Sequence, residues 1–79
     1  MQWEAVGVVV EGQAFELNGL NVWNYEWTET TDDPVDLPHP SYAHQLHRMH
    51  VYEIRDGNRH AVFAAGELSA NVWGFYVPE

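Results

Sequence analysis

The sequence predicts an all-β domain of about six antiparallel strands in a meander, closed into a small barrel or folded into a sandwich. Apolar and polar residues alternate over most of the chain, as they do in strands that bury one face. Asn18-Gly19 and Asp56-Gly57 are strong signals for tight hairpin turns. The chain contains neither an internal repeat nor an alternation of strand and helix patterns, which disfavours a parallel sheet. We expect residues 1–79 to form one domain.

Three strands are expected in the first part of the chain, at residues 3–10, 14–17 and 20–28. Asn18-Gly19 joins the second strand to the third, because both residue types tolerate the positive φ of a type I′ turn. Along the third strand, Trp23, Tyr25 and Trp27 alternate with polar residues. In a strand these three rings lie on one face of the sheet.

After residue 28 the strand pattern stops, and residues 29–46 are expected to form one long loop. Residues 30–40 contain three prolines and three aspartates, and proline is not tolerated in a central strand. A single helical turn fits between Pro40 and Leu46, since proline is favoured at the first helical position. Connections of this length in compact domains are usually functional or disordered, so this loop is the first place to look for a site.

Three more strands are expected in the second half, at residues 47–54, 59–65 and 72–77. Asp56-Gly57 is read as the two-residue loop between the first two of them. That loop pairs His50 with Phe63 and Glu53 with His60. The second of these pairs reads as a polar cross-strand contact rather than as two metal ligands.

Size and composition predict a partner subunit. A chain of 79 residues buries only about 60% of its unfolded surface, and small domains usually add disulfides, a metal or a second subunit. The chain has no cysteine, and it has four Trp, four Tyr and three Phe. Because aromatic residues dominate both cores and interfaces, we expect a homodimer.

The charge balance excludes some functions. Twelve acidic residues against three arginines give a net charge of −9, and the first 47 residues contain neither lysine nor arginine. Such a field repels nucleic acids and anionic membranes, whereas a basic protein partner is attracted. The simpler interpretation is a solvated acidic surface. No signal peptide or membrane span is recognisable, and a cytoplasmic protein is expected.

Two groups of residues are candidates for binding, the aromatic residues of the third strand and the polar residues of the long loop. The aromatic residues have three interpretations: core, subunit interface, or a stacking platform for a planar or sugar-like ligand. The candidate binding residues are Trp23, Tyr25, Trp27, Asp32, Asp33, Asp36, His39 and Tyr42.

The candidate metal ligands are His44, His47 and His50, which are spaced three apart. On a helix the first two share a face and can hold Zn²⁺ or another divalent metal. On a strand a spacing of three places neighbouring side chains on opposite faces. The sequence has no HExxH or HxH motif and no cysteine ligand. The alternatives are structural imidazoles, or a pH-sensitive loop in which histidines charge against nearby acids.

No catalytic residue and no cofactor is assigned. Cysteine and lysine are absent as nucleophiles. Ser41 stands near His44 and Asp36 in the sequence, but a triad is defined by geometry. His44 or His47 would be the base if catalysis exists.

The predicted function is that of a small acidic binding or interaction protein that works as a homodimer through residues 29–47 and the neighbouring aromatic stripe. One alternative is a histidine-based metal protein, with hydrolase activity as one form of it. Another is an acidic inhibitor or immunity-type protein that covers a basic partner. The acids that would serve this second alternative are Glu26, Glu29, Asp32, Asp33 and Asp36. Their convergence on one face would favour it over simple solubility.

Overall fold

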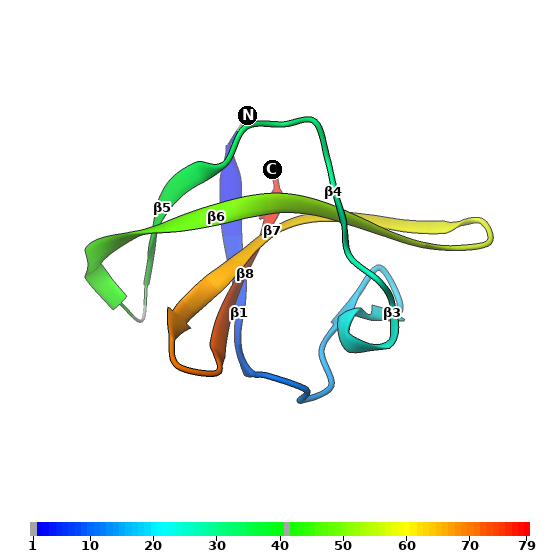
Figure 1. Cartoon of the computed structure of the whole chain (residues 1–79), viewed down its shortest axis with the longest axis horizontal. Coiled ribbons are helices and arrows are strands. Elements are labelled where there is room, and N and C mark those ends of the chain that lie inside the picture. The colour runs from blue at the N-terminus through cyan, green and yellow to red at the C-terminus, as the bar shows by residue number, and fades with distance from the viewer. Residues whose placement is uncertain (1, 41) are drawn as a thin grey trace.

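An open antiparallel sheet organises the chain in the computed structural model, which describes residues 2–40 and 42–79 (Figure 1). Its six strands are β1 (Trp3–Val10), β4 (Thr28–Glu29), β5 (Val35–His39), β6 (Tyr42–Asp56), β7 (Arg59–Ser69) and β8 (Val72–Pro78). The strand order is β1-β8-β7-β6-β4, and β5 also pairs with β6. The predicted all-β class and strand number are confirmed, and within the described residues the sheet does not close into a barrel.

A separate small hairpin pairs β2 (Glu16–Leu17) with β3 (Leu20–Asn21). Its turn is the predicted one, because Asn18 and Gly19 have φ angles of 53° and 80°, as a type I′ turn requires. The base of this hairpin is closed by one more main-chain bond, in which the Val22 amide donates to the Phe15 carbonyl oxygen over 2.9 Å.

The predicted strand 20–28 is wrong, because the chain leaves the extended path after Asn21. A 3-10 helix, η1, covers Val22–Asn24, and pairing resumes only at β4. The Asn21 side-chain oxygen accepts from the Trp23 amide over 3.3 Å, and this cap explains the start of the helix. Trp23 and Trp27 nevertheless lie together, with ring centroids 5.2 Å apart.

The predicted long loop 29–46 is also wrong, since β4, β5 and the first part of β6 occupy most of it. The helical turn expected between Pro40 and Leu46 is replaced by the start of β6. Within the described residues, β5 pairs with β6 alone, and Pro38 stands opposite Leu46. Edge strands tolerate proline because one side of the strand needs no donor, and this explains how a proline-rich stretch can pair.

The β6–β7 hairpin turns one residue later than predicted. Its loop is Gly57-Asn58, and Arg55 pairs with His60 while Glu53 pairs with Val62. The predicted register is therefore wrong by two residues. The cause is the glycine, which has a φ of 61° and takes the first loop position, as in a type II′ turn. The aspartate before it stays in the strand.

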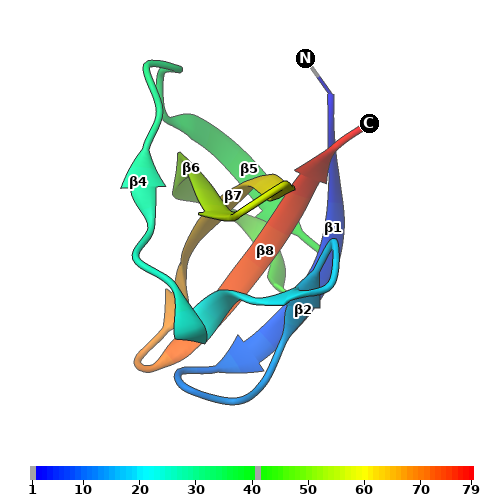
Figure 2. The same ribbon diagram turned by 90° about the vertical axis from the view of Figure 1, so that its right-hand side faces the viewer.

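Each face of the sheet carries its own core. On the first face, buried residues of β1, β6, β7 and β8 pack under the β2–β3 hairpin and the tryptophans; these residues are Val9, Ile54, Ala61, Phe63, Ala65 and Phe75. On the second face, Val35 and Leu37 of β5 pack against a second buried group, which is Met49, Val51, Ala64, Leu68 and Tyr76. The two edges of the sheet, β1 and β4, lie on opposite sides of the molecule (Figure 2). No helix in the described part of the chain has the length and apolar character to cross a membrane.

Candidate functional site

The predicted aromatic residues pack against the first core. Trp27 makes edge contacts with Phe63 and Phe75 at centroid distances of 5.2 and 5.7 Å. Its indole Nε1 donates to the Val22 carbonyl oxygen over 2.8 Å. Tyr25 differs, because its hydroxyl donates to the Asp56 carboxylate over 2.7 Å at the exposed end of the stripe, and this bond raises the pKa of Tyr25. Packing against the first core is sufficient to explain these aromatic residues, without a ligand or a subunit interface.

The predicted acidic residues are all exposed, and they lie on or beside β4 and β5, the two strands that pair with β6 on this side. We call this group the acidic border, and its members are Glu26, Glu29, Asp32, Asp33 and Asp36. Two of them face basic residues of β6. Glu29 Oε1 lies 3.3 Å from His50 Nδ1, and Asp36 Oδ1 lies 3.2 Å from Arg48 Nε.

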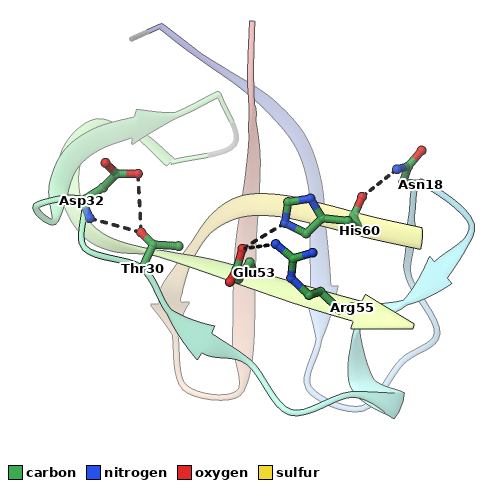
Figure 3. Close-up of polar contacts among 6 residues, drawn as sticks. All are labelled: Asn18, Thr30, Asp32, Glu53, Arg55 and His60. Carbon is green, nitrogen blue, oxygen red and sulfur yellow. Dashed lines mark hydrogen bonds and ion pairs between the residues drawn. The ribbon is translucent and has the colours of Figure 1, made fainter. Parts of the chain in front are cut away.

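The chain between β4 and β5 is held by local hydrogen bonds rather than by contacts with the core. The Asp32 amide donates to Thr30 Oγ1 over 3.2 Å, and the same hydroxyl donates to Asp32 Oδ2 over 3.4 Å (Figure 3). The Thr30 amide donates to the Val51 carbonyl oxygen over 2.9 Å and anchors the turn to β6. The aspartates are thus presented outward on an ordered turn.

His47 and His50, the two candidate ligands whose side chains are described, do not converge. His47 lies edge-on to Tyr42 at 6.0 Å, whereas His50 turns to the acidic border, as a spacing of three in a strand implies. The His44 side chain lies outside the described residues. Among the described residues, no group of three histidines or carboxylates is placed to hold a metal ion.

His39 has a different environment, because it is buried between β5 and β8. Its ring lies 5.5 Å from that of Tyr76, whose hydroxyl donates to the Pro38 carbonyl oxygen over 3.1 Å. Burial lowers the pKa of His39, and a hydrogen bond to the Gly7 backbone partly offsets this effect. Burial also raises the pKa of Tyr76, to about 12. These contacts fix β5 over the second face of the sheet.

A polar cluster covers the outer surface of the β6–β7 hairpin (Figure 3). Glu53 Oε2 lies 2.9 Å from His60 Nε2 and 3.6 Å from Arg55 Nη2. The Asn18 side-chain amide donates to the His60 carbonyl oxygen over 2.7 Å. The predicted contact between Glu53 and His60 is therefore confirmed, although the two are diagonal neighbours. The cluster joins the β2–β3 turn to the main sheet.

The surface that the sequence reasoning missed is the outer edge of β1. Within the described residues, β1 pairs only with β8, so its other edge is open. Val6, Val8 and Val10 are 38%, 40% and 56% exposed beside this edge; we call them the valine stripe. The alternation of valines in the sequence was the available signal, but it could not tell a buried face from an exposed one.

The two edges of the sheet are protected to very different degrees. On the opposite side, β4 has only two residues, β5 contains a proline, and the acidic border adds charge. Short strands, proline and charge are the usual devices that prevent edge-to-edge pairing. β1 has eight residues, with one acid, Glu4, and a register shift between Ala5 and Gly7. The stretch after the shift carries no such protection.

Comparison of the chain with protein-family models, with curated protein sequences and with solved structures finds no match. Function therefore has to be inferred from the surfaces of the chain itself. Of these surfaces, the open edge of β1 combines exposed apolar side chains with unpaired backbone groups. That combination is typical of sites where another strand is added.

Proposed function

We propose that this chain is a small acidic interaction protein that works as a homodimer through the open edge of β1. The observation that carries the proposal is the valine stripe beside an unprotected strand edge. The aromatic residues first considered for an interface pack against the core, so they leave the stripe as the principal apolar surface. Fully burying a valine stabilises by about 1.5–3 kcal/mol, and two half-exposed stripes together offer several kcal/mol.

The test of this proposal is the mass of the protein in solution. Sedimentation equilibrium at micromolar concentrations should give twice the chain mass of 9.1 kDa. Added salt should tighten the dimer, because each copy carries a net charge of −9 and salt screens the repulsion between them. A monomer at all accessible concentrations and salt levels would refute the proposal.

A second candidate function is the covering of a basic partner by the acidic border. It is supported by the position of the five exposed carboxylates, which lie on β4, on β5, and on the chain just before and between these two strands. Clustered charge of one sign raises the association rate and affinity for an oppositely charged surface. Binding of this kind weakens with salt, whereas homodimerisation should strengthen.

Two charge-matched variants test the second candidate, with a polylysine peptide as the probe. In one variant all five acids of the acidic border become amides. In the control, five acids elsewhere become amides: Glu4, Glu11, Glu16, Glu67 and Glu79. Both variants have the same net charge, so a focused site predicts a much larger loss of binding in the first. Equal losses of polylysine binding in the two variants would mean that the acidic border is only a solvated surface and not a binding site.

A further inference from the structure

The backbone of β1 shows which of its groups face the open edge. Beyond the last pair of the β1–β8 ladder, the Glu11 amide donates to the Asn71 carbonyl oxygen over 2.8 Å. Hydrogen-bonded positions alternate along an antiparallel ladder. Val9 and Gly7, two and four positions before Glu11, therefore bond to β8, opposite Trp73 and Phe75. The N–H and C=O groups of Val8 consequently point outward.

The neighbouring outward position is only partly available. The Val10 carbonyl oxygen already accepts from the Gln13 amide over 2.9 Å, in the turn that ends β1. A partner strand therefore finds its full donor and acceptor pair at Val8. With Val8 opposite Val8, the central pair makes both of its hydrogen bonds, and each flanking Val6–Val10 pair lacks only the bond to the occupied carbonyl. With Val8 opposite Val10, neither of the two central pairs is complete, so the free backbone groups favour a centre at Val8.

We infer that β1 pairs antiparallel with β1 of a second copy, with Val8 facing Val8 across a twofold axis; this inference rests on the proposed homodimer. In this register Val6 of each copy faces Val10 of the other, and all three cross-strand pairs are apolar. A symmetric interface has to be self-complementary, and the valine stripe meets this condition. Apolar β-branched pairs also stabilise cross-strand contacts.

Charge favours a second copy over a basic extended peptide as the occupant. The acids nearest the valine stripe are Glu4 and Glu11. Glu11 is turned to the first face of the sheet, where its Oε1 accepts from Trp73 Nε1 over 3.0 Å. Glu4 precedes the register shift between Ala5 and Gly7 and Glu11 follows the end of β1, so no carboxylate lies within the three valine pairs. A basic peptide would find few carboxylates here, since the acidic border lies along the opposite edge.

The absence of cysteine from the sequence allows a direct test by cross-linking. In the inferred register the two Val8 Cα atoms would be about 5.5 Å apart, which lies within the range that a disulfide spans. Val8→Cys should therefore convert rapidly to a covalent dimer under mild oxidation. The matched control is Leu46→Cys, at a residue 68% exposed on β6, which should cross-link at least tenfold more slowly.

A second pair of variants tests the same contact without oxidation. Val8→Lys places two lysines directly opposite each other, and like charges in that position destabilise pairing. The dissociation constant of the dimer should rise at least tenfold, while Leu46→Lys, with the same change in charge, should leave it unchanged. Circular dichroism of both variants checks that they fold.

The outcomes separate the inference from the proposed function. A dimer of the native chain whose Val8→Cys variant cross-links no faster than Leu46→Cys would overturn the register and leave the homodimer standing. A monomeric native chain would overturn both. A monomer that binds a polylysine peptide, with binding lost in Val8→Lys, would overturn both and assign the edge to a basic strand.

Discussion

Glu53 and His60 are diagonal neighbours across the β6–β7 ladder, and Glu53 Oε2 lies 2.9 Å from His60 Nε2. The residue directly opposite His60 is Arg55, whose Nη2 lies 3.6 Å from the same carboxylate oxygen. One carboxylate thus contacts both residues of a directly opposed pair. Long side chains of diagonal neighbours on one face of a sheet can reach each other. Glu53 and His60 are therefore in contact in the observed register, although the predicted register differs from it by two residues.

Replacing Glu53 by Gln should lower the free energy of unfolding by about 0.2–1 kcal/mol, the usual range for cross-strand pairs of this kind. A double-mutant cycle with His60→Gln, measured by urea unfolding, isolates the pair from other effects. Glu16→Gln, at an exposed acid of β2, serves as the control and should be neutral. A coupling energy of zero would mean that the two side chains do not interact in solution.

Gly66→Ala should be among the most destabilising small substitutions in the chain. A Cβ atom at Gly66 would lie 2.6 Å from the Arg48 carbonyl oxygen and 2.7 Å from the Met49 sulfur. Since the carbonyl belongs to the backbone of β6, relief requires a strand to move, and overpacking of this kind costs about 1–3 kcal/mol.

The matched comparison for Gly66→Ala is Gly7→Ala. The atoms nearest to a Cβ atom at Gly7 would be those of the Phe15 ring, at 2.7 Å, and a side chain can move more easily than a strand. Urea unfolding should therefore rank the loss at Gly66 above the loss at Gly7. A larger loss of stability at Gly7 than at Gly66 would mean that β6 can move away from β7 at little energetic cost, and that the close approach of these two strands does not require glycine.

The parts of the fold that the sequence predicts correctly depend on local chemistry. The turn at Asn18-Gly19 needs positive φ at both residues, and only a few residue types supply it. The strands at Trp3–Val10 and Val72–Pro78 follow from alternation alone. In each case the interactions that determine the local structure involve residues close to the pattern that predicts it.

The parts that it misses depend on contacts distant in the sequence. β5 pairs despite Pro38 because it lies at an edge, which no local pattern reveals. The break after Asn21 is closed locally by its side-chain cap, but it is needed for the packing of Trp23 against the first core, which involves residues far along the chain. The candidate site was missed for the same reason, because the exposure of the valine stripe depends on β1 being the outermost strand.

Trp27→Phe should destabilise the fold by about 1–3 kcal/mol, because it removes buried ring area and the hydrogen bond to the Val22 carbonyl oxygen. Urea unfolding should report this loss, and near-ultraviolet circular dichroism should weaken as the contacts among the tryptophans are lost. Tyr25→Phe is the control, since it removes a hydroxyl contact at the exposed end of the stripe. If Trp27→Phe changed the dimer affinity and left the unfolding midpoint unaltered, the aromatic residues would belong to an interface and not to the core.

Tyr76 should be the last tyrosine to ionise. Burial raises its pKa to about 12, from an ordinary value of 10.0, so the folded state favours the neutral phenol. Stability from this group is present below pH 10 and is lost as the pH rises toward 12. The phenolate absorbance should show a late step on titration, and Tyr76→Phe should remove this step. The same substitution should lower the free energy of unfolding by about 0.5–1.5 kcal/mol, because it removes the hydrogen bond to the Pro38 carbonyl oxygen. A late step that persists in this variant would assign it to another tyrosine.

His39 should make the fold less stable as the pH falls. Burial lowers its pKa below the ordinary 6.5, so between the folded and unfolded values the unfolded chain binds more protons. Stability from the neutral imidazole is therefore complete above pH 6.5 and declines as the pH drops through that window. The groups around the ring do not reverse this sign, because His47 on β6 lowers the pKa further, and the bond to the Gly7 backbone only moderates the shift. Urea unfolding of the native chain from neutral pH down to about pH 5 should show the decline, and His39→Gln should flatten it. Titration of the His39 ring protons by NMR provides the independent check, since a midpoint at or above 6.5 would contradict the burial of this ring against Tyr76.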